Sequence, residues 1–391
     1  MMNKFVLFII IVLSICFLII KDKPLIVDEK PHYAQIKGFT EGNFTLNPDL
    51  TTIPGYHYTM YFMASFFKVS SFQWIRLFSL FFSVLSIVIF FKLSKKISKN
   101  HRLKTLQFFS LPIIFPLFFL IYTDVFSMFF VLLSLYFLLA ERYNLSGFSA
   151  IACVLVRQNN IAWLVFICVL IYYEKYRVDY NLEIFIDFLK TIWSFILGMV
   201  GFVVFIIINK GVSLGDTVNH PSFRLHSGNM FFMLFLFFIF FLPLNIANIM
   251  KFNRKSILIV ILFFTLYIFT FTNNHPYNID WGNYILRNKI LIYFSSTPFL
   301  KILFFLPIAF SIMSLSVTTL RNKSYYLLYP FTVLFLVPSW LIEQRYYIVP
   351  FSLFILFKNE KSRLVEYSTI AMYIVTSALL FYGIQKGLFF L

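Results

Sequence analysis

Residues 5–32 read FVLFIIIVLSICFLIIKDKPLIVDEKPH. An apolar run, residues 5–20, leads directly into a polar loop that carries Asp28 and Glu29. An apolar run of this kind is typical of a membrane helix. Because no small-x-small cleavage pattern follows it, we expect a retained first span and not a signal peptide. The loop, residues 21–57, then places two adjacent carboxylates at the edge of the membrane.

The rest of the chain repeats this alternation of apolar runs and short polar connectors. Of 391 residues, 60% are hydrophobic, 13% are charged and 56 are Phe. Further runs begin near Ile75, Leu106, Val125, Gly147, Ile161, Thr191, Met230, Ile257, Lys301, Tyr325, Tyr346 and Ser368. We therefore predict an all-α, polytopic membrane protein of about 13 helices, forming one domain over residues 1–391. The shorter apolar stretch Tyr58–Val69 is expected to be an interfacial or re-entrant helix.

The charge distribution orients the predicted helices. The net charge is +17, and the basic residues gather in connectors such as Lys92–Lys104, which holds no acidic residue. Basic connectors mark the cytosolic side, and they contact anionic membrane lipids rather than nucleic acid. Threading from a cytosolic N-terminus places nearly all clusters of Asp, Glu, His and Asn on the opposite face, together with the glycosylation sequon at Asn43. We expect the functional site on that non-cytosolic face.

Several classes of site lack sequence support. Cys16, Cys153 and Cys168 lie within apolar runs without metal-ligand spacing, which favours small buried side chains. The chain has no P-loop, GxGxxG, HExxH or GxSxG pattern. We expect no metal and no cofactor.

The first loop holds the strongest candidates for chemistry. Transfer of a sugar to a hydroxyl needs a base, and a carboxylate at an apolar interface has the raised proton affinity that suits this task. Asp28 and Glu29 are candidates. The alternative for Asp28 is a structural role as the N-cap of a helix that begins near Glu29; the residues alone do not separate these two interpretations.

Two further polar interruptions lie between apolar runs. Asp124, in Tyr122-Thr123-Asp124, is an N-cap by the favoured interpretation, and a sugar ligand by the other. Arg157, in Arg157-Gln158-Asn159-Asn160, is costly in hydrocarbon and must face water, protein or an anion. A lipid-linked phosphate fits the bidentate guanidinium.

The remaining candidates lie in outer loops nearer the C-terminus. Asp216, His220, Arg224 and His226 form one loop, and residues 274–287 form a second, with Asp280, Tyr284 and Arg287. Glu343 and Arg345 lie between two apolar runs; they pair with each other, or Arg345 faces a phosphate.

These motifs together carry a resemblance that runs in order over nearly the whole chain. The segments are Asp28-Glu29 with His32 and Gln35, Glu41-Gly42-Asn43-Phe44, Thr51-Thr52-Ile53-Pro54-Gly55, Tyr122-Thr123-Asp124 with Ser127, Arg157-Gln158-Asn159-Asn160-Ile161, Gly215-Asp216 with His220 and His226, Asp280 with Asn283-Tyr284, and Glu343 with Arg345-Tyr346. They resemble the motifs of the eukaryotic dolichyl-phosphate-glucose-dependent α-1,2-glucosyltransferase family. One departure is at Asp280-Trp281-Gly282-Asn283-Tyr284, where the family has DNRHY; this puts a direct role for that loop in doubt.

The resemblance implies a GT-C glycosyltransferase of the endoplasmic reticulum membrane with lumenal active-site loops. It implies dolichyl phosphate glucose as donor and a diglucosylated dolichyl-diphosphate oligosaccharide as acceptor. The donor is β-linked and the product α-1,2, so the implied reaction is a single inverting displacement without metal.

We assign expected roles on the combined grounds of residues and resemblance. Asp28 is the expected general base, with Glu29 as the second candidate or as an acceptor-orienting residue. Arg157 and Arg345 are expected to contact the donor phosphate. The expected sugar and acceptor contacts are His32, Asp124, Gln158, Asp216 and His226.

Other functions remain open from the sequence. A GT-C transferase with another polyprenyl-phosphate sugar, such as mannose, would show a similar first loop. A transporter or lipid flippase would line a path with the same polar residues, although no inverted repeat is visible. An inactive regulator is the remaining alternative, which the intact carboxylates argue against.

Overall fold

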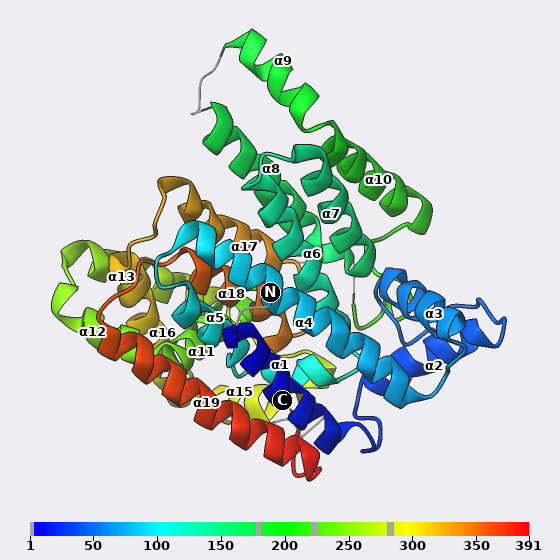
Figure 1. The fold of residues 1–391 in the computed structure, drawn as a ribbon. Coiled ribbons are helices and arrows are strands. Elements are labelled where there is room, and N and C mark those ends of the chain that lie inside the picture. Colours follow the sequence, from blue (N-terminus) through cyan, green and yellow to red (C-terminus); the bar gives the residue numbers. More distant parts are fainter. Residues whose placement is uncertain (1–3, 177–180, 221–224, 280–284, 391) are drawn as a thin grey trace. The chain divides into compact units, whose positions relative to one another are not determined.

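The computed structural model describes residues 4–176, 181–220, 225–279 and 285–390 (Figure 1). Over these residues the regular elements are helices, with one isolated bridge between Leu320 and Lys358. The chain divides into two compact units, each described by itself. The first comprises Met1–Thr105 and Pro116–Val218, and the second comprises Leu106–Phe115 and Asn219–Leu391.

The first unit holds the N-terminal helices. Their bounds are α1 (Lys4–Ile20), α2 (Glu29–Thr40), α3 (Gly55–Phe67), α4 (Phe72–Ile97), α6 (Thr123–Leu138), α7 (Tyr143–Val156), α8 (Ile161–Tyr176), α9 (Leu182–Thr191) and α10 (Trp193–Asn209), with the short 3₁₀ helix η2 (Gln158–Asn160). The division between the units falls inside α5 (His101–Phe109).

The second unit holds the C-terminal helices. Their bounds are α11 (Gly228–Phe240), α12 (Leu242–Asn248), α13 (Arg254–Thr270), α14 (Pro276–Ile279), α15 (Ile290–Ser295), α16 (Pro298–Val317), α17 (Leu328–Leu336), α18 (Ile348–Phe357) and α19 (Arg363–Gln385), with the 3₁₀ helix η6 (Gln344–Tyr347). Ser362, Asn253 and Thr297 cap α19, α13 and α16 with side-chain oxygens that accept backbone N–H groups, as short polar side chains do at helix starts.

The all-α, polytopic prediction is confirmed, and the lengths of the helices differ from expectation. Each predicted apolar run begins within or next to a helix, but turns divide many runs into short pieces. Among the described residues, α4, α16 and α19 are long and apolar enough to cross a membrane. The count rises to 5 if α9 with α10, bent by 72°, and α11 with α12, bent by 85°, each form one span. The single domain over residues 1–391 stays a prediction.

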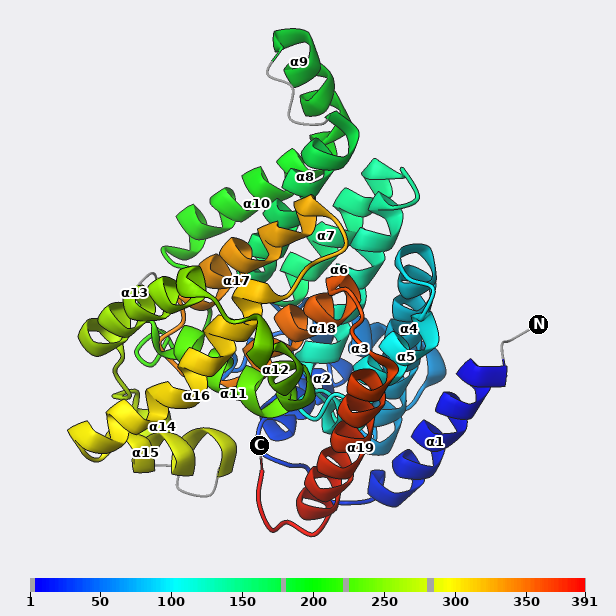
Figure 2. The same ribbon diagram turned by 90° about the vertical axis from the view of Figure 1, so that its left-hand side faces the viewer.

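Small polar side chains join the helices of the first unit. The hydroxyl of Ser134 on α6 donates to the carbonyl oxygen of Ser146 on α7 at 2.7 Å, and the hydroxyl of Ser146 donates back to the carbonyl oxygen of Ser134 at 2.8 Å. Small residues let apolar helices approach closely and satisfy each other's polar groups. α6, α7, α8 and α10 run alongside one another in this unit, with α9 beyond the ends of α8 and α10 (Figure 2).

Aromatic side chains fill the interior of the second unit. Phe237 and Phe241 on α11 and its C-terminal end stack at 4.5 Å and meet Phe354 of α18 edge-on at 5.1 Å. Such edge-to-face pairs add to the energy of apolar contact. α16 lies next to both α11 and α13 (Figure 2).

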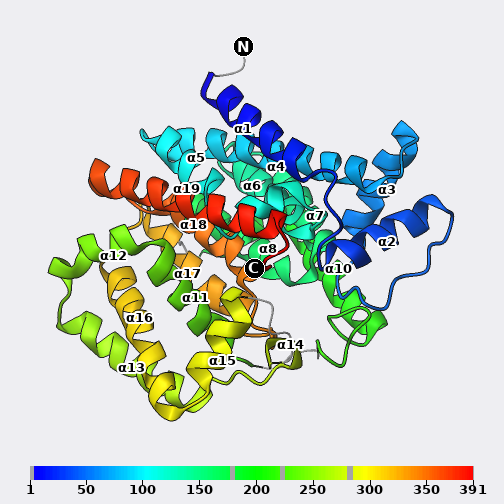
Figure 3. The same cartoon turned by 90° about the horizontal axis from the view of Figure 1, so that it is seen from below.

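The first loop of the chain, residues 21–57, contains α2 and leads into α3. α2 and α3 lie side by side (Figure 3) over an apolar core made of Ile36, Tyr56, Met60, Ala64, Ile75, Phe78, Ile121, Phe126 and Val156. The first residue of α3, Gly55, meets the backbone of α7: a Cβ added there would lie 2.4 Å from the carbonyl oxygen of Leu155. The sequence Pro54-Gly55 thus lets α3 begin directly against α7.

Replacing Gly55 by Ala should therefore destabilise the protein, because the obstructing atom is backbone and cannot rotate away. We expect a loss of about 1–3 kcal/mol, as for other overpacked sites, measured as a lower unfolding temperature in detergent. Gly201→Ala on α10 is the matched control, since nothing lies within 4 Å of its added Cβ. Alanine there should leave stability equal or slightly higher. Equal stability of both variants would contradict the packing described for α3.

Candidate active site

A buried ion pair anchors the first loop. The guanidinium of Arg76 on α4 donates from Nε to Oε1 of Glu29 at 2.9 Å and from Nη2 to Oε2 at 2.6 Å. Both side chains are 0% exposed. This is the parallel, bidentate geometry in which Arg and a carboxylate interact most strongly.

Two backbone groups complete the bonding of Glu29. The N–H of Ile121 donates to Oε1 at 2.9 Å, and the N–H of Ile26 donates to Oε2 at 3.0 Å. A carboxylate has about four acceptor positions, so each is taken by a donor. Glu29 thus joins the start of α2, α4 and the segment before α6, and it has no acceptor position left for a substrate proton.

Arg76 also caps the C-terminal end of α1. Its Nη1 donates to the carbonyl oxygens of Ile20 at 3.0 Å, Lys21 at 3.2 Å and Lys23 at 2.7 Å. Its Nη2 reaches the carbonyl oxygen of Pro24 at 3.2 Å. Carbonyl groups at a helix end lack partners within the helix, and a cation complements the partial negative charge there.

Asp28 occupies the N-cap position of α2 but does not cap it. Its backbone is helical, with φ −71° and ψ −13°, and its side chain makes no capping hydrogen bond. The side chain is half-buried. The capping role considered for Asp28 is therefore wrong, and the carboxylate stands beside a fully bonded Glu29.

His32 lies one turn after Asp28 on α2. Its backbone N–H donates to the carbonyl oxygen of Asp28 at 3.2 Å. Its Nδ1 lies 2.9 Å from Nε2 of His57 on α3, with the two side chains 7% and 0% exposed. Burial, with a smaller contribution from His32, holds the pKa of His57 well below its ordinary value.

Gln158 holds the second half of the first loop. Its amide Nε2 donates to the carbonyl oxygens of Thr51 at 2.5 Å and Val212 at 3.0 Å, and its Oε1 accepts from the N–H of Ile53 at 3.2 Å. Three segments distant in sequence are thus joined by one side chain. The structure places Gln158 as a buried cross-link of the backbone.

The Gly215-Asp216 pair packs against the same loop. Gly215 has φ +58°, and a Cβ there would lie 2.3 Å from the carbonyl oxygen of Pro48. Only glycine combines this left-handed conformation with so close an approach. Asp216 is thereby held, half-buried, next to the first loop.

Asp124 and Arg157 form a second ion pair in the first unit. The Asp124 side chain is 2% exposed and the Arg157 side chain 14% exposed. Asn160, from the same motif as Arg157, donates to Ser127 Oγ at 2.7 Å. The two motifs that begin at Tyr122 and Arg157 therefore bond to each other twice.

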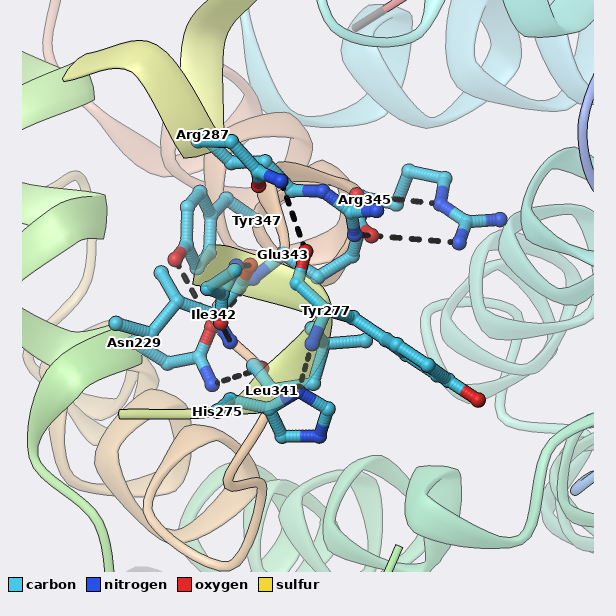
Figure 4. A network of polar contacts seen from close by, with 11 residues as sticks. Asn229, His275, Tyr277, Arg287, Leu341, Ile342, Glu343, Arg345 and Tyr347 are labelled. Carbon is cyan, nitrogen blue, oxygen red and sulfur yellow. Dashed lines mark hydrogen bonds and ion pairs between the residues drawn. The ribbon is translucent and has the colours of Figure 1, made fainter. Parts of the chain in front are cut away.

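The second unit has its own polar network (Figure 4). Glu343 is buried and receives two arginines: Arg287 pairs with Oε2, and Nε of Arg345 lies 3.3 Å from Oε1. Of the two alternatives for Glu343 and Arg345, the pairing of the two is confirmed. One carboxylate against two guanidinium groups leaves a local excess of positive charge, and the Arg345 side chain is 14% exposed.

Asn229 positions this network at the start of α11. Its Oδ1 accepts from the N–H of Glu343 at 3.0 Å and from the hydroxyl of Tyr347 at 2.9 Å. Its Nδ2 donates to the carbonyl oxygens of Ser339 and Leu341. The amide is thus fully bonded, which fixes the segment that carries Glu343 (Figure 4).

The other predicted residues of the second unit are more scattered. The ring of His226 stacks on Trp340 at 5.9 Å. The Asp280-Asn283-Tyr284 motif and Arg224 lie outside the described residues. Asp28, Glu29, His32, Asp124, Arg157, Gln158 and Asp216 fall in the first unit, and His226 and Arg345 fall in the second.

Sequence reasoning missed the residues that fix these groups in place. Arg76 stands near the start of an apolar run, where a charge needs a buried partner, and this signal would have identified it had it been used. His57 and Asn229 carry no comparable signal, because their partners come from other segments. Among the described residues, no group of three His, Cys, Asp or Glu side chains could hold a metal ion.

Comparison with known proteins gives a family and several relatives. The model of the DIE2/ALG10 family matches residues 22–183 and 176–356. A relative from Candida albicans is 29% identical over 70% of this chain and 65% of its own length. Relatives from Homo sapiens and Candida glabrata are each 25% identical, over 84% and 85% of this chain and 82% and 74% of their own lengths. All three are named Dol-P-Glc:Glc(2)Man(9)GlcNAc(2)-PP-Dol alpha-1,2-glucosyltransferase. No solved structure matches.

Replacing Arg76 by Met should be among the most damaging changes in the first unit, because it leaves the Glu29 carboxylate buried without its cation. Breaking such a pair costs about 3–5 kcal/mol, and we expect a large fall in the unfolding temperature and in the yield of folded protein. Arg102→Met on α5 is the control, since Arg102 is exposed and its loss should change stability by no more than about 0.5 kcal/mol. Equal stability of the two variants would contradict the anchoring role of Arg76.

Proposed function

The chain belongs to the DIE2/ALG10 family, and from that premise we propose that it transfers glucose from dolichyl phosphate glucose to a diglucosylated dolichyl-diphosphate oligosaccharide. The product linkage is α-1,2, and the transferred glucose is the third and terminal one. The relatives' names support glucose as the sugar in preference to mannose. The observation that carries the mechanism is the bonding of Glu29: four donors take its acceptor positions, so we assign the role of base to its neighbour Asp28, whose side chain does not cap α2.

Asp28 is the general base in this proposal. The acceptor hydroxyl oxygen attacks the anomeric carbon, its proton passes to Asp28, and the bond from the anomeric carbon to the phosphate oxygen breaks with its electron pair. The β-linked donor thereby gives an α-linked product in one displacement. A half-buried carboxylate that does not cap α2 suits this task, and general-base catalysis contributes about 10²–10⁴-fold in rate.

The second unit, taken by itself, carries positive charge of the kind that stabilises a lipid phosphate as a leaving group. Arg287 and Arg345 share the single carboxylate of Glu343, so the three side chains carry a net positive charge. Fixed cations at the position where negative charge develops need no rearrangement during the reaction. Arg157 is neutralised by Asp124, which makes Arg345 the stronger of the two predicted phosphate contacts.

An apolar cavity in the second unit suits the lipid chain of the donor. Its volume is about 250 Å³, and its lining includes Met230, Leu234, Phe237, Ile312, Val333 and Phe351. Met230 follows Asn229, which bonds the Glu343 backbone, and Phe351 lies in the helix that follows η6. The cationic network is thus followed along α11 and α18 by residues that line an apolar cavity, which matches a phosphate with an isoprenoid tail.

The site faces the lumen of the endoplasmic reticulum in this proposal. The basic connectors fall on one side of the threaded chain and the motif loops on the other. The acidic motif residues, together with the sequon at Asn43, are then on the side where the oligosaccharide acceptor is completed. Asp124, Asp216 and His32 serve as sugar contacts in the first unit, where Gln158 supports the backbone of the first loop. His226 serves as a sugar contact in the second unit.

Expression in cells that lack the terminal α-1,2-glucosyltransferase tests this function. The wild-type chain should convert the two-glucose lipid-linked oligosaccharide to the three-glucose species, read as a mass increase of one hexose. Asp28→Asn should leave the two-glucose species unconverted at equal expression, because an amide cannot accept the proton. Asp49→Asn, an exposed carboxylate of the same loop, should convert normally. If the wild-type chain inserts and leaves the two-glucose species unchanged, the substrate assignment is wrong.

Replacing Arg345 by Gln should weaken donor binding, since a hydrogen bond to a charged group contributes about 1.5–3 kcal/mol. We expect KM for dolichyl phosphate glucose to rise by roughly 10-fold or more, with KM for the acceptor unchanged, in an assay of the purified protein in nanodiscs. The protein should stay folded, because Glu343 keeps Arg287. Arg363→Gln, an exposed arginine of the same unit, is the control. An unchanged donor KM in Arg345→Gln would remove the phosphate role.

A further inference from the structure

The histidine pair between α2 and α3 carries an inference beyond the proposed roles. Nδ1 of His32 lies 2.9 Å from Nε2 of His57, and the ring centroids are 5.1 Å apart. His57 is 0% exposed. The ring of Tyr56 lies edge-on to both histidines. A hydrogen bond between two imidazoles needs one donor and one acceptor. The proton between the two rings therefore belongs either to Nδ1 of His32 or to Nε2 of His57.

The other nitrogen of His57 decides between the two arrangements. Nδ1 of His57 is buried and has no hydrogen-bond partner among the residues that the structure describes. If His32 donated from Nδ1, His57 would accept at Nε2 and a neutral ring would carry its proton on Nδ1. That proton would be a buried N–H group without an acceptor, and orphaned buried donors are rarer than orphaned acceptors.

The opposite arrangement leaves only a lone pair at that position. His57 then donates from Nε2 to Nδ1 of His32, and neutral His32 carries its proton on Nε2. A doubly protonated His32 would also have to donate from Nδ1 and is disfavoured for the same reason. Burial lowers the pKa of His57 well below its ordinary value, so His57 stays neutral in this role.

We propose that His57 is a positioning residue, which fixes His32 as the neutral tautomer with its proton on Nε2. His32 lies one turn from Asp28 on α2. With its proton on Nε2, neutral His32 has no basic nitrogen on the side away from His57, so it does not compete with Asp28 for the proton of the acceptor hydroxyl. The tautomer follows from the geometry of the histidine pair alone. Its catalytic consequence rests on the proposed function.

Two substitutions separate positioning from packing. His57→Gln keeps an N–H donor three bonds from Cβ, as Nε2 of histidine is. His57→Phe keeps a ring and removes the donor. In nanodiscs we expect kcat to fall by 10-fold or more in His57→Phe and to stay within about 3-fold of wild type in His57→Gln, with KM for the donor and the unfolding temperature unchanged in both. Wild-type kcat in His57→Phe, or an equal fall in both variants, overturns the proposal.

The tautomer itself is measurable without any reaction. Nitrogen-15 NMR of the histidine-labelled protein in nanodiscs, assigned by His32→Gln and His57→Gln, should show His32 unprotonated at Nδ1 and protonated at Nε2. A protonated Nδ1 on His32 overturns the proposal, even if a variant fails to fold. Failure of the proposed function would give a different result: the wild-type protein would lack glucosyltransferase activity, and His32 would still carry its proton on Nε2.

Discussion

The bidentate ion pair between Arg76 and Glu29 is the constraint on which the first unit depends. Six backbone groups, five from residues 20–26 and one from Ile121, bond to these two side chains, which are both fully buried. Burying either charge alone is costly, so the pair persists only while both partners and their backbone hydrogen bonds are in place. The end of α1, the start of α2 and the entry to α6 are therefore fixed together. Asp28 is held at that junction by its neighbour.

The two adjacent carboxylates have different environments and hence different roles. Glu29 is enclosed by four donors, whereas Asp28 is half-buried at a helix start that it does not cap. The second unit uses charge in another way, with two arginines on Glu343 and a net positive charge beside an apolar cavity. The first unit thus offers a carboxylate suited to general-base chemistry, and the second unit, by itself, offers cations beside an apolar cavity, which suit a lipid phosphate.

The sequence predicted the fold class better than the lengths of the helices. Apolar runs identified where helices begin, because burial of apolar side chains dominates their placement. Their lengths were not predictable, since breaks such as the turn between α11 and α12 depend on packing between helices. Glu29 and Asp28 are alike in the sequence, and only the long-range contact with Arg76, 47 positions away, separates them. The pairing of Glu343 with Arg345 was one of two open alternatives. Arg287 also pairs with Glu343, although it follows a motif that departs from the family pattern.

The most direct test of this division of roles is turnover per folded molecule for Asp28→Asn and Glu29→Gln, measured in single-turnover reactions on purified protein in nanodiscs. We predict that Glu29→Gln lowers the yield and stability of folded protein, because an amide cannot accept from four donors. Its surviving molecules should keep a rate within about 10-fold of wild type. Asp28→Asn should fold normally and lose about 10²-fold or more of the rate. A stable but inactive Glu29→Gln beside an active Asp28→Asn would reverse the assignment and contradict the account.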